Sequence, residues 1–222
     1  MIKLIKKDMY ISRGNIAWVL LFPILSIYFW IAGSRSQALF NLTFTYIVLS
    51  LSCLAHNSLL GLGVKNNTKF LIASLPIDRA KDIKSKYFVS ALFPVIYSIL
   101  FYLFFLYIGI TRRFGPVSIN TNSILVSYEL ILLAPSISII YIGFTMPLYY
   151  GESKVIKVLG IIPNILIAFL PPILLNLEKY IDISYIFEFN LTRSSLIAFI
   201  ISIPIYLASM KLTINLYNKK EF

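Results

Sequence analysis

Side chains able to do chemistry are few in this chain of 222 residues, and the clearest of them lies inside an apolar stretch. We place Glu129 about seven residues inside that stretch, which corresponds to a depth on the order of 10 Å at 1.5 Å per helical residue. Burying an ionised carboxylate there would cost roughly 2.5–3.5 kcal/mol or more. We therefore expect Glu129 to face other helices, to pair with a cation or to stay protonated, and proton relay is the chemistry that it offers.

Glu129 shares a helical face with residues that follow or precede it at a spacing of seven. The other members are Asn122, Ser136 and Gly143. We expect this face to line a transport path or the seam of a dimer. The alternative is that the Glu129 carboxyl reaches Arg112 or Arg113 near the outer surface.

His56 and Cys53 are the only histidine and the only cysteine. An intramembrane enzyme, such as a protease of the CAAX type, needs clustered acids and histidines to activate water. We expect no metal site and no catalytic residue, because a lone histidine without nearby cysteines or acids is typical of a hydrogen-bonded packing residue.

The elements that must position these residues are membrane helices, because 59% of the residues are hydrophobic and only 13% are charged. A bilayer core of about 30 Å needs roughly 20 mostly apolar residues per helix. The sequence predicts one all-helical membrane domain over residues 1–222, with spans at about 16–32, 38–60, 88–110, 124–148, 155–175 and 196–217. The second span carries many polar residues, which indicates that it is shielded inside the bundle.

The charges indicate the orientation of these spans. With a cytoplasmic N-terminus, 15 of the 20 Lys and Arg residues fall in inner segments and five in outer segments. This is the positive-inside pattern, so we expect both termini in the cytoplasm. A nucleic-acid partner is not expected, since no folded basic domain remains outside the spans. Residues 1–15 also carry an apolar stripe and lysines, which predicts a short interfacial helix on the inner leaflet.

Proline occurs in five of the six predicted spans, at Pro23, Pro94, Pro135, Pro163 and Pro204. Each removes a backbone donor, a defect that membrane helices absorb because neighbouring helices satisfy the freed carbonyls. The prolines are either ordinary features of such helices or hinges for a path that opens and closes.

The basic segment ASLPIDRAKDIKSKYF, residues 73–88, separates the second and third spans. Asp78 is a suitable N-cap for a helix that runs through Arg79 and Lys81 into the third span. Before it, Ser74 is followed by an apolar corner of Leu75, Pro76 and Ile77 with charges around it, which is typical of a surface that binds another protein. Lys84 and Lys86 could instead bind anionic lipid headgroups.

SLPIDRAKDIKSKY resembles the cytoplasmic signature of the ABC type-2 permeases, the membrane subunits of ATP-driven exporters. MPLYYGESK, residues 146–154, resembles the turn after the fourth span of that family, and it contains Gly151 and Lys154. Six spans, both ends inside and the N-terminal KKDMY also agree. The resemblance covers nearly the whole chain.

The resemblance implies a permease subunit in a bacterial cytoplasmic membrane that dimerises with itself or with a sister permease. It also implies two separate ATPase subunits that bind ATP and Mg²⁺, docked on the segment from Ser74 to Lys81 and on the Gly151–Lys154 turn. The chain itself has no phosphate-binding loop, because GLGVKNNT at Gly61 has the wrong spacing and no GKS or GKT occurs.

Small permeases of this kind are similar to exporters of amphipathic or antimicrobial peptides, including phenol-soluble modulin exporters and bacteriocin immunity systems linked to virulence and antimicrobial resistance. A path lined by aromatic side chains would suit such cargo. The alternative function is a proton-coupled secondary transporter that uses Glu129 as its relay, although such proteins usually show inverted repeats or broken helices.

Overall fold

The computed structural model describes residues 2–11, 37–65, 78–113, 127–151 and 191–219, and the elements there are all α-helices. They are α1 (Ile2–Ile11), α3 (Gln37–Lys65), α5 (Arg79–Arg113), α6 (Leu130–Tyr150) and α9 (Leu191–Asn218). The predicted all-helical class is therefore confirmed in the described part of the chain, as is a helix in the N-terminal segment.

Three described helices are long and apolar enough to cross a membrane, at Arg79–Tyr107, Leu130–Tyr150 and Leu191–Asn218. A shorter apolar helix covers Phe44–Leu60. These four correspond to the third, fourth, sixth and second predicted spans. The first and fifth predicted spans, 16–32 and 155–175, lie outside the described residues, so six spans and cytoplasmic termini stay predictions.

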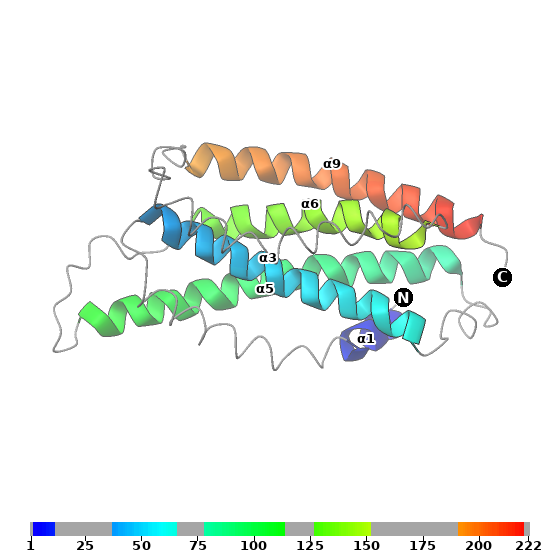
Figure 1. The fold of residues 1–222 in the computed structure, drawn as a ribbon, viewed down its shortest axis with the longest axis horizontal. Helices are drawn as coiled ribbons and strands as arrows, with labels where there is room; N and C mark the ends of the chain where they lie inside the picture. The colour runs from blue at the N-terminus through cyan, green and yellow to red at the C-terminus, as the bar shows by residue number, and fades with distance from the viewer. Residues whose placement is uncertain (1, 12–36, 66–77, 114–126, 152–190, 220–222) are drawn as a thin grey trace.

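Helices α3, α6 and α9 run in the same direction, and α5 runs in the opposite direction (Figure 1). The bundle therefore has two ends. At one end the first residues of α5 meet the last residues of α3, α6 and α9. At this end α1 lies against α5 and α3. We call this the α1 end, and the other the Glu129 end. Helix α6 is central, because it contacts α3, α5 and α9.

Each end has its own core. Near the Glu129 end the buried side chains are aliphatic and aromatic: Phe44, Ile47, Val48, Leu51, Ala55, Tyr97, Phe101, Phe105, Leu130 and Ala134. Near the α1 end three tyrosines join the apolar residues: Leu60, Ile83, Tyr87, Ile142, Met146, Tyr150 and Tyr217. The first core includes the early α6 residues Leu130 and Ala134, and the second includes the later α6 residues Ile142, Met146 and Tyr150.

Part of the polar set of α3 is inside the bundle, as predicted, whereas Asn57 is exposed. Ser52, Cys53 and His56 are all buried. The imidazole of His56 lies 3.2 Å from Ser90 Oγ through Nδ1 and 3.1 Å from Thr145 Oγ1 through Nε2. The prediction that His56 is a hydrogen-bonded packing residue is confirmed.

Helix α6 begins later than predicted. The fourth span was expected from Ile124, but the described helix starts at Leu130, and residues 127–129 form a turn in which Leu130 N–H donates to Ser127 O at 3.1 Å. Glu129 thus precedes the helix instead of lying seven residues inside it. With 21 residues and a rise of 1.5 Å each, α6 is about 31 Å long, close to the thickness of a bilayer core.

Candidate functional site

The start of α5 is built as the sequence predicts. The Asp78 carboxylate accepts a hydrogen bond from Ala80 N–H at 2.9 Å, and the Asp78 carbonyl accepts one from Lys81 N–H at 2.9 Å. An N-cap of this kind satisfies amides that have no partner within the helix. The helix then continues for 35 residues, through Pro94, to Arg113. The capped first turn and the apolar part of α5 are one continuous element.

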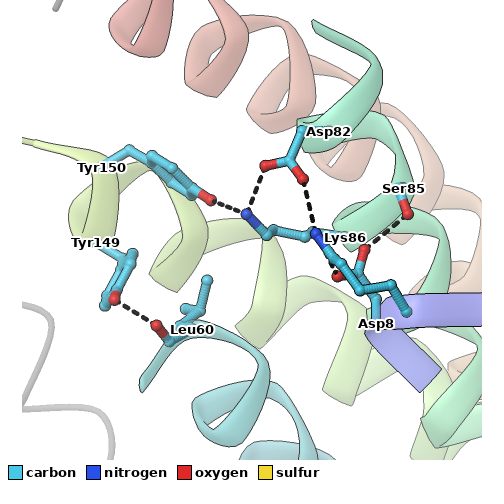
Figure 2. A network of polar contacts seen from close by, with 8 residues as sticks. Asp8, Leu60, Asp82, Ser85, Lys86, Tyr149 and Tyr150 are labelled. Carbon is cyan, nitrogen blue, oxygen red and sulfur yellow. Dashed lines mark hydrogen bonds and ion pairs between the residues drawn. The ribbon is translucent and has the colours of Figure 1, made fainter. Parts of the chain in front are cut away.

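In the first two turns of α5, a buried ion pair forms within the helix, and its lysine also contacts α6 (Figure 2). Lys86 Nζ donates to Asp82 Oδ2 at 2.6 Å and to the Tyr150 hydroxyl at 3.3 Å. The Asp82 side chain is 0% exposed and that of Lys86 14%. Breaking the ion pair would leave a charge in a low-dielectric interior, so the pair holds Lys86 in place, and the hydrogen bond from Lys86 to Tyr150 links α5 to α6.

Helix α1 is attached to the same cluster. Lys7 Nζ donates to Asp82 Oδ1 at 3.3 Å, and Ser85 Oγ donates to Asp8 Oδ2 at 2.7 Å (Figure 2). Lys7 and Asp8 also pair with each other at 3.4 Å. Asp8 is 1% exposed although α1 is only 10 residues long. The polar side of α1 therefore docks on α5.

Several apolar residues of α1 are exposed, whereas Leu4 and Ile5 are partly buried. Ile2, Met9 and Tyr10 are exposed, although Ile2 and Met9 belong to the predicted apolar stripe. Lys3 and Lys6 are exposed as well. An exposed face of apolar and basic residues is what an interfacial helix presents to a membrane surface, so the placement of α1 on the inner leaflet stays a prediction with this exposure in its favour.

Burial raises the pKa of the Asp8 carboxyl above its ordinary value of 3.8, because the charged form loses its hydration. The hydrogen bond from Ser85 and the charges of Lys7 and Lys86 oppose this rise, and the charge of Asp82 adds to it. The protonated form of Asp8 is thus favoured more in the folded protein than in the unfolded chain.

The cluster is balanced in charge and in hydrogen bonds. It contains two carboxylates, Asp8 and Asp82, and two ammonium groups, Lys7 and Lys86. No buried side-chain nitrogen or oxygen in the described residues lacks a hydrogen-bond partner. Because paired and fully bonded charges are the form in which ions are tolerated in a protein interior, the cluster can be a permanent part of the fold.

Tyrosines surround the cluster and connect it to two further helices. The Tyr150 ring lies 5.4 Å from the ring of Tyr217 in α9, in an edge-on arrangement. The guanidinium of Arg79 lies 5.9 Å from the centre of the Tyr217 ring, a cation–π contact. The Tyr149 hydroxyl donates to the Leu60 carbonyl of α3 (Figure 2). All five described helices thus meet at the α1 end.

The sequence-predicted docking residues divide into two groups. Asp78, Arg79, Lys81 and Gly151 are described and lie at the α1 end, and Lys81 Nζ pairs with Asp78 at 3.8 Å. Gly151 N–H donates to Pro147 O at 3.0 Å and ends α6. The rest lie outside the described residues: Ser74, Leu75, Pro76, Ile77 and Lys154. Their role in binding an ATPase stays a prediction.

The second predicted set, around Glu129, is spread over α6. Glu129 lies at the start of the helix, where its carboxylate accepts a hydrogen bond from Thr192 Oγ1 of α9 at 3.1 Å. Ser136 is buried and donates to Leu132 O within α6, and Gly143 faces α9. Asn122 lies outside the described residues. A role for this face in a transport path or a dimer seam stays a prediction.

Lys86 is the clearest correction at this site. The alternative that Lys84 and Lys86 both bind lipid headgroups fits Lys84, which is exposed, but not Lys86, which is largely buried beside Asp82 and Tyr150. The roles of Asp82 and Asp8 were missed altogether. The one sequence signal was the spacing of four between Asp82 and Lys86, with the acid on the N-terminal side, which is the favourable order in a helix.

The comparison with family models decides the class of the protein. The model described as "ABC-2 family transporter protein" matches residues 3–218. The chain belongs to this family. The ABC-2 resemblance noted from the SLPIDRAKDIKSKY and MPLYYGESK segments is therefore confirmed. Neither the comparison with curated proteins nor the comparison with solved structures gave a match.

Family membership makes the chain a multi-pass membrane protein and the membrane component of an ABC transporter, not its catalytic part. It also implies ABC ATPases as partners. The buried cluster at the α1 end is the candidate functional site of this ABC-2 protein, because it joins the predicted docking segment to every described helix.

Proposed function

We propose that the chain is the permease subunit of an ATP-driven exporter, and that the cluster at the α1 end couples it to two separate ATPase subunits. In this proposal the ATPases bind ATP and Mg²⁺ and dock on the segment from Ser74 to Lys81 and on the turn from Gly151 to Lys154. Two permease subunits, identical or sister chains, together form the path.

The observation that carries the proposal is the continuity between Asp78 and the buried cluster. The helix capped by Asp78 carries Asp82 and Lys86 within its first two turns. Asp82 binds Lys7 of α1, and Lys86 binds Tyr150 of α6. A displacement of the docking segment would therefore move α5, α1 and the end of α6 together instead of bending a loose loop.

The length of α5 supports the same function. Its 35 residues span about 52 Å at 1.5 Å per residue, whereas a bilayer core is about 30 Å thick. The helix is long enough to cross the membrane and extend beyond it by several turns. The charged first turns are the part that would project toward an ATPase.

The cargo that we propose is an amphipathic or antimicrobial peptide, in the manner of phenol-soluble modulin export. The described interior is rich in aromatic side chains, including Phe44, Phe101 and Phe105. Such side chains would pack against the apolar face of a peptide. Export of a labelled amphipathic peptide from cells that carry the permease and its ATPase, with no export of a scrambled peptide without an apolar face, tests this part.

Proton-coupled transport through Glu129 is the less favoured function. Family membership points to an ATP-driven partner instead. Glu129 also lies at the end of α6, bonded to Thr192, and not midway along a described span.

The decisive experiment is co-purification of the detergent-solubilised protein from its native host. We expect an ABC ATPase to co-purify with the wild-type protein and to be lost from a Leu75→Asp, Arg79→Glu double variant. The matched control is Arg193→Glu, a charge reversal at the Glu129 end of α9, which should retain the ATPase. Recovery of no nucleotide-binding protein with the wild type, or equal recovery with the double variant, would contradict the proposal.

A further inference from the structure

Helix α6 contains two prolines, Pro135 and Pro147. A proline has no backbone N–H, so the carbonyl four residues earlier loses its helical donor. In α6 these carbonyls belong to Ile131 and Gly143. Each would be a buried acceptor without its usual partner in a medium that offers no water.

Each of these two carbonyls accepts a hydrogen bond from a serine of a different neighbouring helix. Ser98 Oγ of α5 donates to Ile131 O at 3.1 Å. Ser209 Oγ of α9 donates to Gly143 O. Both serines are buried. The hydroxyls therefore replace the amides that the two prolines lack.

Other buried serines of the same helices behave differently. Ser138 of α6 donates to Ala134 O, and Ser202 of α9 donates to Phe199 O, each within its own helix. This is the ordinary bond of a serine in a helix, three or four residues back. Ser98 and Ser209 reach across to α6 instead, and they do so at the two carbonyls that a proline has freed.

We infer that Ser98 and Ser209 are positioning residues that close the two proline breaks of α6. Ser98 ties the segment near the Glu129 end to α5, and Ser209 ties the segment near the α1 end to α9. Helix α6 can bend at either proline only when the corresponding serine releases its carbonyl.

The backbone around Gly143 is arranged to allow the second contact. A Cβ added at Gly143 would lie 3.4 Å from Ile205 Cγ2 and 3.8 Å from Tyr206 Cα, so α9 passes very close to α6 at this residue. Small residues permit such close approach of membrane helices. The close approach brings Ser209, one turn further along α9, within reach of the Gly143 carbonyl.

A chain of hydroxyls holds Ser209 in place. Tyr87 of α5 lies 2.7 Å from Ser209 Oγ and 2.6 Å from Thr213 Oγ1 through its own hydroxyl. Since the Ser209 hydrogen goes to Gly143 O, Tyr87 is the donor to Ser209, while the Thr213 hydroxyl donates to the Ser209 carbonyl at 2.9 Å. Hydrogen bonds aligned in one direction reinforce one another, so α5 contributes to this contact as well.

The position of Pro147 connects this arrangement to the ionic cluster. Pro147 precedes Tyr149 and Tyr150, whose hydroxyls contact Leu60 and Lys86. The last turn of α6 is therefore attached to the cluster, and the segment before the break is attached to α9 through Gly143 and Ser209. Release of Ser209 would remove the tie on the Gly143 side of the break, so the last turn and the rest of α6 could move separately.

Double-mutant cycles on the detergent-solubilised full chain test the inference without any assay of transport. Pro147→Ala restores an N–H that can bond to Gly143 O, so it should make Ser209 dispensable. We expect Ser209→Ala to lower the unfolding midpoint by about 1–2 °C in the wild-type background, the shift for one interhelical hydrogen bond of about 0.6 kcal/mol in a protein of this size. In the Pro147→Ala background the same substitution should lower it by less than half as much.

The second pair provides an independent test and the control. Ser98→Ala should lower the midpoint in the wild type but much less in the Pro135→Ala background. In crossed pairs, such as Ser209→Ala with Pro135→Ala, the full shift should remain. Ser138→Ala should show no dependence on either proline. Equal shifts in matched and crossed backgrounds would overturn the inference, and if one proline variant does not fold, the other pair decides.

Discussion

The two ends of the bundle are held together by different interactions. At the α1 end, Asp8, Asp82, Lys7 and Lys86 form a buried ionic cluster bordered by tyrosines. Toward the Glu129 end, the described core is made of aliphatic and aromatic side chains, with the rings of Phe44 and Phe105 centred 6.1 Å apart. Helices α3, α5, α6 and α9 reach both ends, whereas α1 contributes Lys7 and Asp8 at the α1 end only.

Apolar contacts and buried polar contacts differ in how strictly they fix the relative position of two helices. Inside a bilayer, lipid tails are as apolar as leucine, so apolar contacts between helices gain only from close packing. They tolerate small shifts of one helix along another. Buried ion pairs and hydrogen bonds have defined distances and angles, and a shift leaves a polar group unpaired. The α1 end should therefore move as a unit, whereas the Glu129 end can repack.

The largest effect is expected from Lys86→Met. It would leave Asp82 buried with Lys7 as its remaining partner, and removal of one member of a buried ion pair costs about 3–5 kcal/mol of folding free energy. Unfolding of the purified protein in detergent measures the loss. The double variant Asp82→Leu, Lys86→Met should be less destabilised than the single variant. A loss below about 1 kcal/mol for the single variant would show that the cluster does not hold this end together.

Phe101→Ala should have the next largest effect, about 3 kcal/mol, because it leaves a cavity in the core near the Glu129 end. Leu103→Ala on the same helix is the matched control, since that side chain is exposed and should change stability by less than about 0.5 kcal/mol. The same unfolding measurement applies. Similar losses for the two variants would mean that close packing is not what stabilises this core.

His56→Leu should cost about 1 kcal/mol, because interhelical hydrogen bonds in membrane proteins average about 0.6 kcal/mol and His56 contacts both Ser90 and Thr145. Adding Ser90→Ala to His56→Leu should cost little more. A double-mutant cycle of unfolding free energies measures the coupling between the two substitutions. Full additivity would argue against a hydrogen bond between His56 and Ser90.

The smallest effect at neutral pH is expected from Asp8→Asn. The pKa of Asp8 is raised in the folded state, so its favourable contribution is present below the unfolded value of 3.8 and is lost as the pH rises through the folded pKa. The stability of the wild type relative to Asp8→Asn should therefore fall as the pH rises above about 4. Thermal unfolding of both proteins at a series of pH values above about 4 measures this stability difference. A difference that increases with pH would contradict a raised pKa of Asp8 in the folded protein.

Local chemistry was predictable from the sequence, whereas burial was not. The N-cap at Asp78 and the helix that follows it depend on neighbouring residues only, and both were predicted. The burial of Lys86 depends on Lys7 and Asp8 from α1 and on Tyr150 from α6, which are distant in the chain. A lysine in a basic segment has the same sequence signature whether it is exposed or paired.

The start of α6 shows a second limit. The apolar run from Ile124 to Leu148 indicates a span but not where its helix begins, because hydropathy is independent of backbone conformation. Turn bonds to Ser127 and Tyr128 place the first helical residue at Leu130. The prolines of α6 show what the sequence does predict. Neighbouring helices were expected to satisfy the freed carbonyls, but only the three-dimensional arrangement identifies Ser98 and Ser209 as the donors.

The common direction of α3, α6 and α9 has an electrical consequence that is independent of side chains. An α-helix carries a partial charge of roughly −0.5 at its C-terminus and +0.5 at its N-terminus. Three C-termini and one long-helix N-terminus meet at the α1 end, so the backbone alone contributes on the order of one negative charge there. The peptide groups thus attract the lysines of the cluster, as Asp8 and Asp82 do. The helix backbone is negative at the end of the bundle where these lysines lie.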